Sequence, residues 1–482
     1  MKLYDPALFR QECYIGGKWL SAQKTIPVTN PADGTVIGCI PSMGRGEAQR
    51  AIKSAKDAFP SWSRLTAKKR SEILKRWFTA ICDNKNDLAY IMTCEQGKPL
   101  SEALAEVLSA AAYIEWFAEE AKRVYGDTIP MSQEGKRIVV LKEPVGVCAA
   151  ITPWNFPSAM IARKTAPALA AGCTVIVKPS ELTPFSALAL AELADRAGVP
   201  PGVFNVITGP AEEIGSELTG SFDVRKVSFS GSTSVGRILM RNCSDTLKRI
   251  SLELGGHAPF IVFEDADIDV AVADAVDSKF RNSGQTCVCA NRFIIHESAY
   301  TEFVEKFVKT IESQLSPGSG LIADNNQGPL IDIDAIEKVE DQIKDALQKG
   351  ARIATGGKRI PGKGLFFQPT VLLDVTPEMK ILKEETFGPI APVSLFKTEK
   401  EAIAMANDSE YGLAAYFYSR DSGRAWRVTE SLEYGMVGVN TARLSSEAAP
   451  FGGMKKSGIG REGSKYGMDE YLEIKYMCIG GI

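Results

Sequence analysis

From residue 145 onward, short apolar runs alternate with helical stretches. The runs are rich in Val and Ile and read VGVCAAITP, CTVIVKPS, VFNVITG and KVSFSG. The stretches between them, such as FSALALAELADRAG, space their apolar residues as a buried helix does. This alternation predicts a doubly wound parallel sheet. Such sheets bind ligands beyond the carboxyl ends of their strands, where this sequence carries TPWN, KPSE, TGPA and SGSTSVG.

The patterns on either side of this region predict two further parts. The first 125 residues look helical, and the segment SEALAEVLSAAAYIEWFAEEAKRVYG carries one apolar stripe at helical spacing. We interpret the stripe as core packing rather than as a cofactor site; its residues are Leu104, Leu108, Ala111, Ile114 and Phe117. Past residue 256, HAPFIVF, DIDVAVADAVDSKF, NRFIIH and AAYFYS form a second alternating series, which predicts a second α/β domain.

Two segments have the pattern of exposed strands. GDTIPMSQEGKRIVVLKEPVG combines strand-forming residues with turn residues, so we expect a hairpin that extends out of its domain. The tail YGMDEYLEIKYMCIGGI alternates apolar and polar residues like an edge strand.

Composition narrows the class of protein. A chain of 482 residues exceeds what one hydrophobic core normally serves, which again predicts at least two domains. A net charge of −3 gives no global attraction for nucleic acid or acidic membranes. We find neither a signal-peptide core nor a run of about 18 apolar residues. The ten cysteines are too sparse for a disulfide framework, so we expect reduced thiols and a cytoplasmic protein.

The two histidines, His257 and His296, limit the chemistry. A His-rich metal centre is nearly excluded, and a histidine-activated nucleophile would have to use one of these two. The closely spaced Cys287 and Cys289 in RNSGQTCVCAN lack the further ligands that a metal site needs. A nucleophilic Cys287 therefore needs a carboxylate base, a helix terminus or a bound cation to form its thiolate.

Glycine-rich and charged motifs suggest a nucleotide site. GIGREG (458–463) and GKRIPGKG (357–364) match phosphate-binding patterns by letter only, and we interpret both as turns. FSGSTSVG is better placed, because a strand precedes it and a helix follows. Gly231, Ser232 and Thr233 then either bind an anion at the helix start or form an ordinary capped turn. KPSE supplies Lys178 and Glu181 after another strand, although a solvated loop has the same pattern.

Glu253 in LELGG stands inside a short apolar strand. Burial disfavours a carboxylate unless the carboxylate is paired with a cation or takes part in the reaction. Burial also raises its pKa toward the range that suits a general base. A structural ion pair is the alternative.

LELGG, GQTCVCAN, EETFGP and PFGGMKKSGIGRE together resemble the aldehyde dehydrogenase superfamily, and the resemblance covers essentially the whole chain. Within it, the chain is most similar to the succinate semialdehyde dehydrogenases. The resemblance implies that Cys287 attacks the aldehyde, that Asn155 forms an oxyanion hole with the Cys287 backbone N–H, and that Glu253 activates water. It implies oxidation of succinate semialdehyde to succinate through a thiohemiacetal and a thioester, in 4-aminobutyrate degradation.

The resemblance also implies a dinucleotide site. Its residues would be Trp154, Lys178, Glu181, Gly231, Ser232, Gly236, Glu385 and Phe387. Glu181 suits a ribose 2′-hydroxyl and repels a 2′-phosphate, so we favour NAD. NADP is the alternative, because similar bacterial enzymes often use it with a small neutral residue in place of Glu181.

Arg163, Arg281 and Ser445 match the residues that hold the distal carboxylate in succinate semialdehyde dehydrogenases. Bidentate arginine is well suited to a carboxylate. Arg443 departs from the common pattern and either adds a contact, favours the longer glutarate semialdehyde, or faces solvent. Other aldehydes, or a catalytically silent redox-sensing protein, are the rival functions.

Cys289 has no role in the general family reaction. If residues 287–289 are extended, the two thiols approach disulfide distance, which suggests a reversible redox pair; a small buried apolar residue is the alternative.

The expected fold is therefore α/β and aldehyde dehydrogenase-like, with two doubly wound parallel-sheet domains and a small β oligomerisation element. We expect a dinucleotide-binding domain (1–122 and 144–255), a catalytic domain (256–464) and an oligomerisation element (123–143 and 465–482). Unpaired edge strands invite pairing between subunits, and the family forms homodimers and homotetramers.

Overall fold

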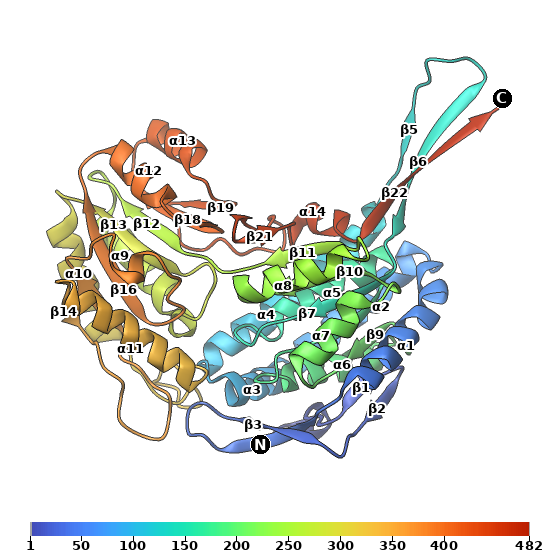
Figure 1. Ribbon diagram of the computed structural model, residues 1–482, viewed down its shortest axis with the longest axis horizontal. Coiled ribbons are helices and arrows are strands. Elements are labelled where there is room, and N and C mark those ends of the chain that lie inside the picture. Colours follow the sequence, from blue (N-terminus) through green and yellow to red (C-terminus); the bar gives the residue numbers. More distant parts are fainter. Residues whose placement is uncertain (1, 482) are drawn as a thin grey trace.

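The computed structural model describes residues 2–481 and contains two large sheets with a smaller one projecting from them (Figure 1). The eight-stranded sheet has the order β2-β1-β9-β8-β7-β10-β11-β21. Its five central strands are parallel: β7 (Val147–Ile151), β8 (Thr174–Lys178), β9 (Phe204–Val206), β10 (Val224–Ser230) and β11 (Arg249–Glu253). These are the strands that the alternating apolar runs predict. They are connected through α5 (Ala159–Ala171), α6 (Phe185–Arg196), α7 (Ala211–Gly220) and α8 (Thr233–Ser244).

Both edges of this sheet are antiparallel. β1 (Cys13–Ile15) pairs with β2 (Lys18–Leu20) and β9, and β21 (Gly458–Ile459) pairs with β11. A separate hairpin joins β3 (Thr25–Thr29) to β4 (Val36–Pro41). The expectation that the first 125 residues are helical is therefore wrong for residues 13–41. These strands are short and gain their stability from pairing with distant or neighbouring segments, which local periodicity does not record.

Four helices follow these strands and pack beside the eight-stranded sheet. They are α1 (Arg45–Ser63), α2 (Ala67–Asp83), α3 (Lys85–Gln96) and α4 (Leu100–Glu120). Ala111, Ile114 and Phe117 of the predicted stripe are buried, but Leu108 is 42% exposed. The buried face of α4 instead runs through Val107, so the stripe is correct only in its second half.

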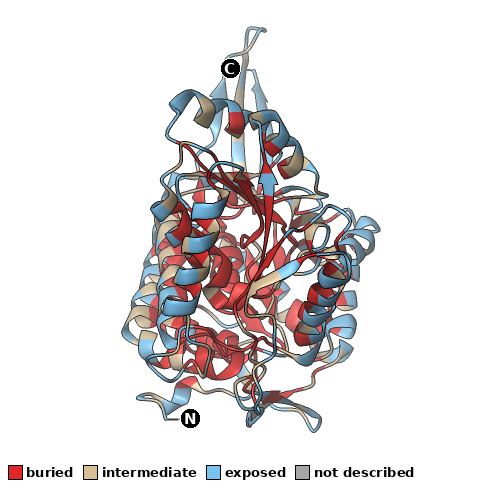
Figure 2. Cartoon of the chain, turned by 90° about the vertical axis from the view of Figure 1, so that its left-hand side faces the viewer, coloured by how far each residue is buried: buried red, intermediate tan, exposed pale blue. Residues whose placement is uncertain are grey.

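The seven-stranded sheet has the order β14-β15-β16-β13-β12-β18-β19 and confirms the second α/β region. Its strands are β12 (Ala258–Val262), β13 (Ala290–His296), β14 (Arg352–Thr355), β15 (Thr370–Leu373), β16 (Ile390–Phe396), β18 (Ala414–Tyr418) and β19 (Met436–Val439). Only the β14–β15 pair is antiparallel. The helices are α9 (Ile268–Phe280), α10 (Tyr300–Gln314), α11 (Ile333–Gln348), α12 (Glu399–Asn407) and α13 (Ser422–Ser431). Figure 2 shows buried strands behind helices whose outer faces are exposed.

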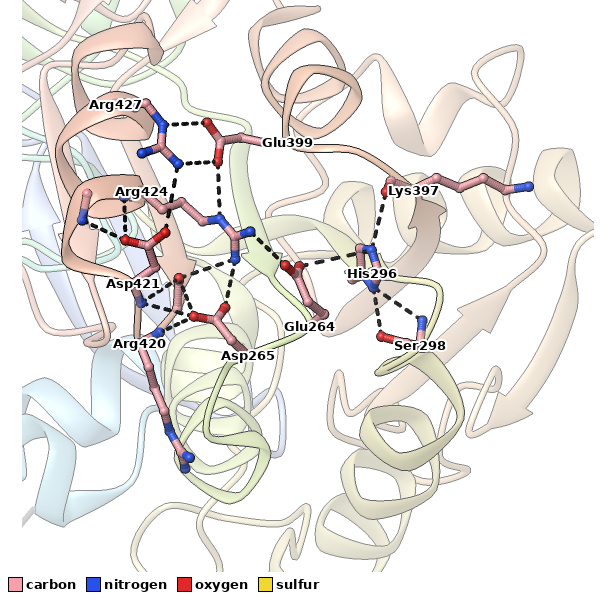
Figure 3. Close-up of polar contacts among 12 residues, drawn as sticks. Glu264, Asp265, His296, Ser298, Lys397, Glu399, Arg420, Asp421, Arg424 and Arg427 are labelled. Atoms are coloured by element: carbon pink, nitrogen blue, oxygen red, sulfur yellow. Dashed lines mark hydrogen bonds and ion pairs between the residues drawn. The ribbon is translucent and has the colours of Figure 1, made fainter.

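Arg424 connects α13 to the loop after β12 (Figure 3). Its side chain is 14% exposed and forms ion pairs with Glu264 at 2.6 Å, Asp265 at 2.8 Å and Glu399 at 3.1 Å. Because Glu399 is the first residue of α12, this network fixes both outer helices to the seven-stranded sheet.

The third sheet extends away from the body at the upper right of Figure 1 and has the order β22-β6-β5. It pairs β6 (Lys136–Pro144) with β5 (Asp127–Ile129) and with β22 (Leu472–Gly480), as the predicted hairpin and tail strand require. Apolar side chains on the edge strand β22 are exposed, including Ile474 at 71% and Tyr476 at 62%. No helix within residues 2–481 is long and apolar enough to cross a membrane.

Candidate active site

Two adjoining cavities meet at Cys287. The larger, of about 260 Å³, lies at the carboxyl ends of β7, β10 and β11. Its lining includes predicted site residues from distant parts of the chain: Trp154, Asn155, Gly231, Ser232, Glu253, Cys287, Glu385 and Phe387. The smaller, of about 160 Å³, contains Arg163, Arg281 and Ser445. Both cavities share Met160, Cys287 and Phe451, so a thiol stands between one compartment and the other.

The Cys287 thiol is neutral in this environment. Burial raises its pKa to about 12, and the carboxylates of Glu385 and Glu253 act in the same direction. The nearby guanidinium of Arg163 is the cation that opposes this rise. Formation of a nucleophilic thiolate therefore requires a base or further positive charge.

Asn155 is fixed by contacts to both its side chain and its backbone. Its Nδ2 donates a hydrogen bond to the Gln285 carbonyl oxygen at 3.0 Å. Its own carbonyl oxygen accepts hydrogen bonds from Lys98 Nζ at 2.7 Å and from Asn282 Nδ2 at 3.1 Å. The amide group of Asn155 carries two N–H donors, so one remains for a ligand beside Cys287.

The turn before Cys287 is strained. Asn282 and Ser283 have φ values of 50° and 55°, in the left-handed region that costs energy for residues other than glycine. The carboxylate of Glu102 accepts a hydrogen bond from the Asn282 N–H at 2.8 Å, and Ser283 Oγ donates to the Gly328 carbonyl at 2.7 Å. These contacts hold the turn that orients the nucleophile loop.

Glu253 is the last residue of β11, and its Oε2 is buried without a hydrogen-bond partner among residues 2–481. Burial raises the pKa of Glu253 well above its usual value, and the neighbouring carboxylate of Glu462 raises it further. Glu462 itself is paired with Lys164. A Cβ atom at Gly452 would lie 3.0 Å from Glu253 Oε1, so glycine there leaves room for the carboxyl group. Such a carboxyl group has the burial and elevated pKa of a general base.

The predicted dinucleotide residues lie along the ends of three strands. Ser232 caps α8, with its Oγ accepting from the Val235 N–H at 3.3 Å. Gly236 packs one turn later against Leu254, where a Cβ atom would approach Cδ2 to 2.5 Å. At the end of β8, Lys178 Nζ and Glu181 Oε1 form an ion pair of 2.5 Å. Gly236, Lys178 and Glu181 do not line the larger cavity itself.

The larger cavity is also lined by a carboxyl group and two aromatic rings. Glu385 Oε1 accepts a hydrogen bond from the Gly256 N–H at 2.8 Å, and burial raises its pKa to about 7. The rings of Trp154 and Phe387 meet edge to face, 5.5 Å apart. A helix N-terminus and acceptor groups in one cavity fit a phosphate-linked nucleotide with ribose hydroxyls.

The smaller cavity presents two guanidinium groups that form no ion pair among residues 2–481. Arg163 is 5% exposed, and its Nε and Nη1 are buried without hydrogen-bond partners, as is Arg281 Nε. Aromatic rings of Tyr113 and Phe451 lie 4.9 and 4.3 Å from the Arg163 guanidinium carbon. Neither arginine forms an ion pair within residues 2–481. Buried unpaired cations are costly, so the cavity is complementary to an anion.

Arg443, by contrast, faces solvent. Its side chain is 79% exposed and its Nε forms an ion pair with Asp277 at 3.2 Å. It is absent from the lining of the smaller cavity, so of the three alternatives for this residue the structure has the solvent-facing one.

Cys289 lies outside both cavities. Residues 286–289 form a turn closed by a hydrogen bond from the Cys289 N–H to the Thr286 carbonyl at 3.0 Å, so the extended segment assumed from the sequence is wrong. The buried Cys289 thiol donates to the carbonyl oxygens of Lys279 and Ala290, and burial raises its pKa. A disulfide with Cys287 would require both contacts to break.

Several lining residues were not singled out from the sequence. Lys338 lies in the larger cavity, and Glu102, Glu106 and Phe156 line the smaller one. Glu102 and Glu106 are ordinary surface-type residues in a helical pattern, so only the packing of α4 against the nucleophile loop shows where they lie.

Within residues 2–481, no three His, Cys, Asp or Glu side chains are grouped as metal ligands would be.

Comparison with known proteins agrees with this architecture. The model of the aldehyde dehydrogenase family matches residues 19–477, and the chain belongs to that family of NAD(P)-dependent oxidoreductases. It is 59% identical to the succinate-semialdehyde dehydrogenase [NADP(+)] of Escherichia coli, with 100% of each chain covered. It is 58% identical to a glutarate-semialdehyde dehydrogenase of Pseudomonas aeruginosa, again over 100% of both.

A solved structure shows the same fold. The crystal structure of succinate-semialdehyde dehydrogenase from Burkholderia pseudomallei superposes with a TM-score of 0.98 at 56% identity, with 100% of each chain covered. The expected aldehyde dehydrogenase fold is thereby confirmed. The relatives differ in the aldehyde that their names give, so the family assignment alone leaves the substrate open.

Proposed function

We propose that this chain oxidises aldehydes that carry an anionic group at the far end, with succinate semialdehyde as the main substrate and succinate as the product. The observation that carries the proposal is the smaller cavity, where buried nitrogens of Arg163 and Arg281 have no hydrogen-bond partner among residues 2–481 and which Cys287 also lines. A distal carboxylate would pair with the guanidinium groups while the aldehyde carbon lies at the thiol. Ser445 adds a hydroxyl donor.

The residues around Cys287 supply the steps that this oxidation needs. Glu253 accepts the proton of the Cys287 thiol and passes it to solvent, and the resulting thiolate attacks the aldehyde carbon to form a thiohemiacetal. The free N–H of Asn155 Nδ2 and the backbone N–H of Cys287 stabilise the oxyanion, and each such donor typically contributes about 2.7–4 kcal/mol. Bound NAD(P) supplies the hydride acceptor. Glu253 then takes a proton from water, which hydrolyses the resulting thioester and releases the acid.

The cofactor that we propose is NAD. In the Lys178–Glu181 ion pair the ammonium is already neutralised, so it offers no free positive charge for a 2′-phosphate. Glu181 keeps an oxygen for a ribose 2′-hydroxyl. The name of the Escherichia coli relative gives NADP(+) as its cofactor, so kcat/KM has to be measured with both NAD and NADP.

For the assembly, we propose that the three-stranded sheet, within 123–143 and 465–482, pairs with a second subunit to give a homodimer or homotetramer. The unpaired edge of β22 and its exposed Ile474 and Tyr476 support this proposal. Sedimentation equilibrium measures the subunit number, and a monomer at micromolar concentration would contradict the pairing.

The remaining segments would form the dinucleotide-binding domain (1–122 and 144–255) and the catalytic domain (256–464).

A comparison of two arginine variants tests the substrate. Arg281→Ala should raise KM for succinate semialdehyde by about 10- to 100-fold, the loss expected when one charged hydrogen-bond partner is removed. It should leave KM for butanal, which has the same length but no charge, nearly unchanged. Arg443→Ala is the matched control and should change neither, because Arg443 faces solvent.

Three outcomes would overturn parts of this proposal. An equal rise in KM for both aldehydes in Arg281→Ala would contradict the proposed distal-anion site. A higher kcat/KM for glutarate semialdehyde than for succinate semialdehyde would change the main substrate. Absence of NAD(P) reduction with every aldehyde would indicate a catalytically silent protein.

A further inference from the structure

The smaller cavity is lined by two carboxyl groups, those of Glu102 and Glu106, as well as by its arginines. Glu102 lies in the first turn of α4 and lines this cavity together with Arg163, Arg281 and Cys287. A carboxylate here is unexpected in a cavity whose other charged groups favour an anion, because like charges in a confined volume repel one another.

The hydrogen bonds of Glu102 leave one of its oxygens free. Oε2 accepts a hydrogen bond from the Asn282 N–H at 2.8 Å, whereas Oε1 has no hydrogen bond or ion pair to any residue from 2 to 481. Glu106, one turn further along α4, differs in this respect. It is paired with Lys98 at 2.5 Å and accepts from the N–H groups of Ser158 and Ala159. Glu102 is therefore the carboxyl group of the cavity whose charge is not directly compensated.

The charged groups around Glu102 come from each element packed against it. Burial is the largest influence and raises its pKa to about 7. Lys98 before α4, the Asn282 N–H and Arg281 oppose the rise, while Asp277 of α9 adds to it. Near neutral pH the side chain thus exists in both protonation states.

We propose that Glu102 is a specificity-determining residue that takes up one proton from solvent when an aldehyde with a distal anion enters the smaller cavity. This inference rests on the proposed function of that cavity. The neutral carboxyl group removes the repulsion between two anions that share about 160 Å³. Its O–H donates a hydrogen bond toward the distal anion, while the other oxygen still accepts from Asn282.

The proposal fixes the direction of a pH dependence. Above pH 7 Glu102 is ionised in the free protein, and binding of an anionic aldehyde must be preceded by protonation. The affinity for such aldehydes therefore falls as pH rises through about 7, whereas the affinity for uncharged aldehydes does not respond to this group. A substrate carboxylate, with an ordinary pKa near 4, stays ionised throughout.

The test is the ratio of kcat/KM for succinate semialdehyde to kcat/KM for butanal, measured from pH 6 to pH 9 with saturating cofactor. The ratio cancels ionisations that both reactions share, including those of Cys287 and Glu253. In the wild-type protein it should fall by roughly 100-fold, because the protonated fraction of a carboxyl group with a pKa of about 7 falls from about 0.9 at pH 6 to about 0.01 at pH 9. In Glu102→Gln, which keeps an oxygen acceptor for Asn282, the ratio should be high and independent of pH. Glu115→Gln, an exposed position on the same helix, should behave as the wild type.

The outcomes separate this inference from the function on which it rests. A wild-type ratio near one at every pH would overturn the distal-anion site itself. A large ratio that does not change with pH, or one that falls equally in Glu102→Gln, would overturn the role of Glu102 alone. A wild-type ratio that does not change with pH overturns the role of Glu102 even if the Glu102→Gln variant does not fold.

Discussion

Lys98 and Glu106 form an ion pair in the protein interior, with 2.5 Å between Nζ and Oε2 and side chains that are 1% and 2% exposed. The same Nζ donates a hydrogen bond to the backbone oxygen of Asn155, and Glu106 Oε1 accepts from the N–H groups of Ser158 and Ala159. Two residues outside the reacting groups thus fix the loop that carries the amide next to the nucleophile.

Lys98→Met should destabilise the protein strongly, because it leaves Glu106 charged and buried without its cation. Breaking a buried pair in this way typically costs about 3–5 kcal/mol, which urea-induced unfolding would detect. Where the variant still folds, kcat should fall to a similar extent for succinate semialdehyde and butanal, since Asn155 acts at the aldehyde end. Lys53→Met breaks an exposed pair with Asp57 and should cost about 1 kcal/mol or less. Equal destabilisation by the two substitutions would refute the argument.

The pH dependence of acid release should report on the neighbouring carboxyl groups. Glu253 acts as a base only when ionised, and Glu462 helps to raise its pKa. Glu462→Gln removes this like charge and frees the ammonium of Lys164, so the pKa of Glu253 should fall. The rising limb of the rate of thioester hydrolysis, measured in single turnovers, should then move to lower pH. Glu473→Gln, on the exposed strand β22, is the control; an unmoved limb in Glu462→Gln would show that the two groups are not coupled.

The sequence was informative where chemistry follows a strand. Asn155, Ser232 and Glu253 stand at or just after the ends of β7, β10 and β11, and the rule that parallel strands present ligands at their carboxyl ends brings them together. Cys287 joins them through a loop from the other sheet. Its place is clear only from family motifs, because no periodicity links residue 287 to residue 253.

Features that depend on packing between distant segments could not be predicted. The three-residue strand β1 exists through its pairing with β2 and β9. The left-handed turn at Asn282 is held by Glu102 from another helix, and the turn at 286–289 replaces the extended segment that the letters CVC suggest. In each case the deciding contact is tertiary, so local propensity gives no sign of it.

Oxidation should affect Cys287 and Cys289 together. We predict that peroxide inactivates the protein and that dithiothreitol restores activity through a disulfide between the two thiols. This pairing requires Cys289 to leave its contacts with the Lys279 and Ala290 carbonyls, so inactivation should be slow. In Cys289→Ala, recovery should be largely lost as Cys287 oxidises further. Cys478→Ala, which removes an exposed thiol of β22, is the control, and full recovery in Cys289→Ala would exclude the pair.

The Lys178–Glu181 ion pair gives the sharpest prediction about the cofactor. With Glu181 in place, a 2′-phosphate meets a carboxylate and an ammonium that is already neutralised, so kcat/KM should be higher with NAD than with NADP. Glu181→Ser removes the repulsion and releases the charge of Lys178. It should raise kcat/KM with NADP by about tenfold, equivalent to about 1.4 kcal/mol, and lower that with NAD by the loss of one ribose hydrogen bond. Glu212→Ser makes the same charge change at an exposed position on α7 and should leave both values unaltered. If the wild-type protein prefers NADP, Lys178 must reach the phosphate despite Glu181, and the proposed discrimination by this pair is wrong.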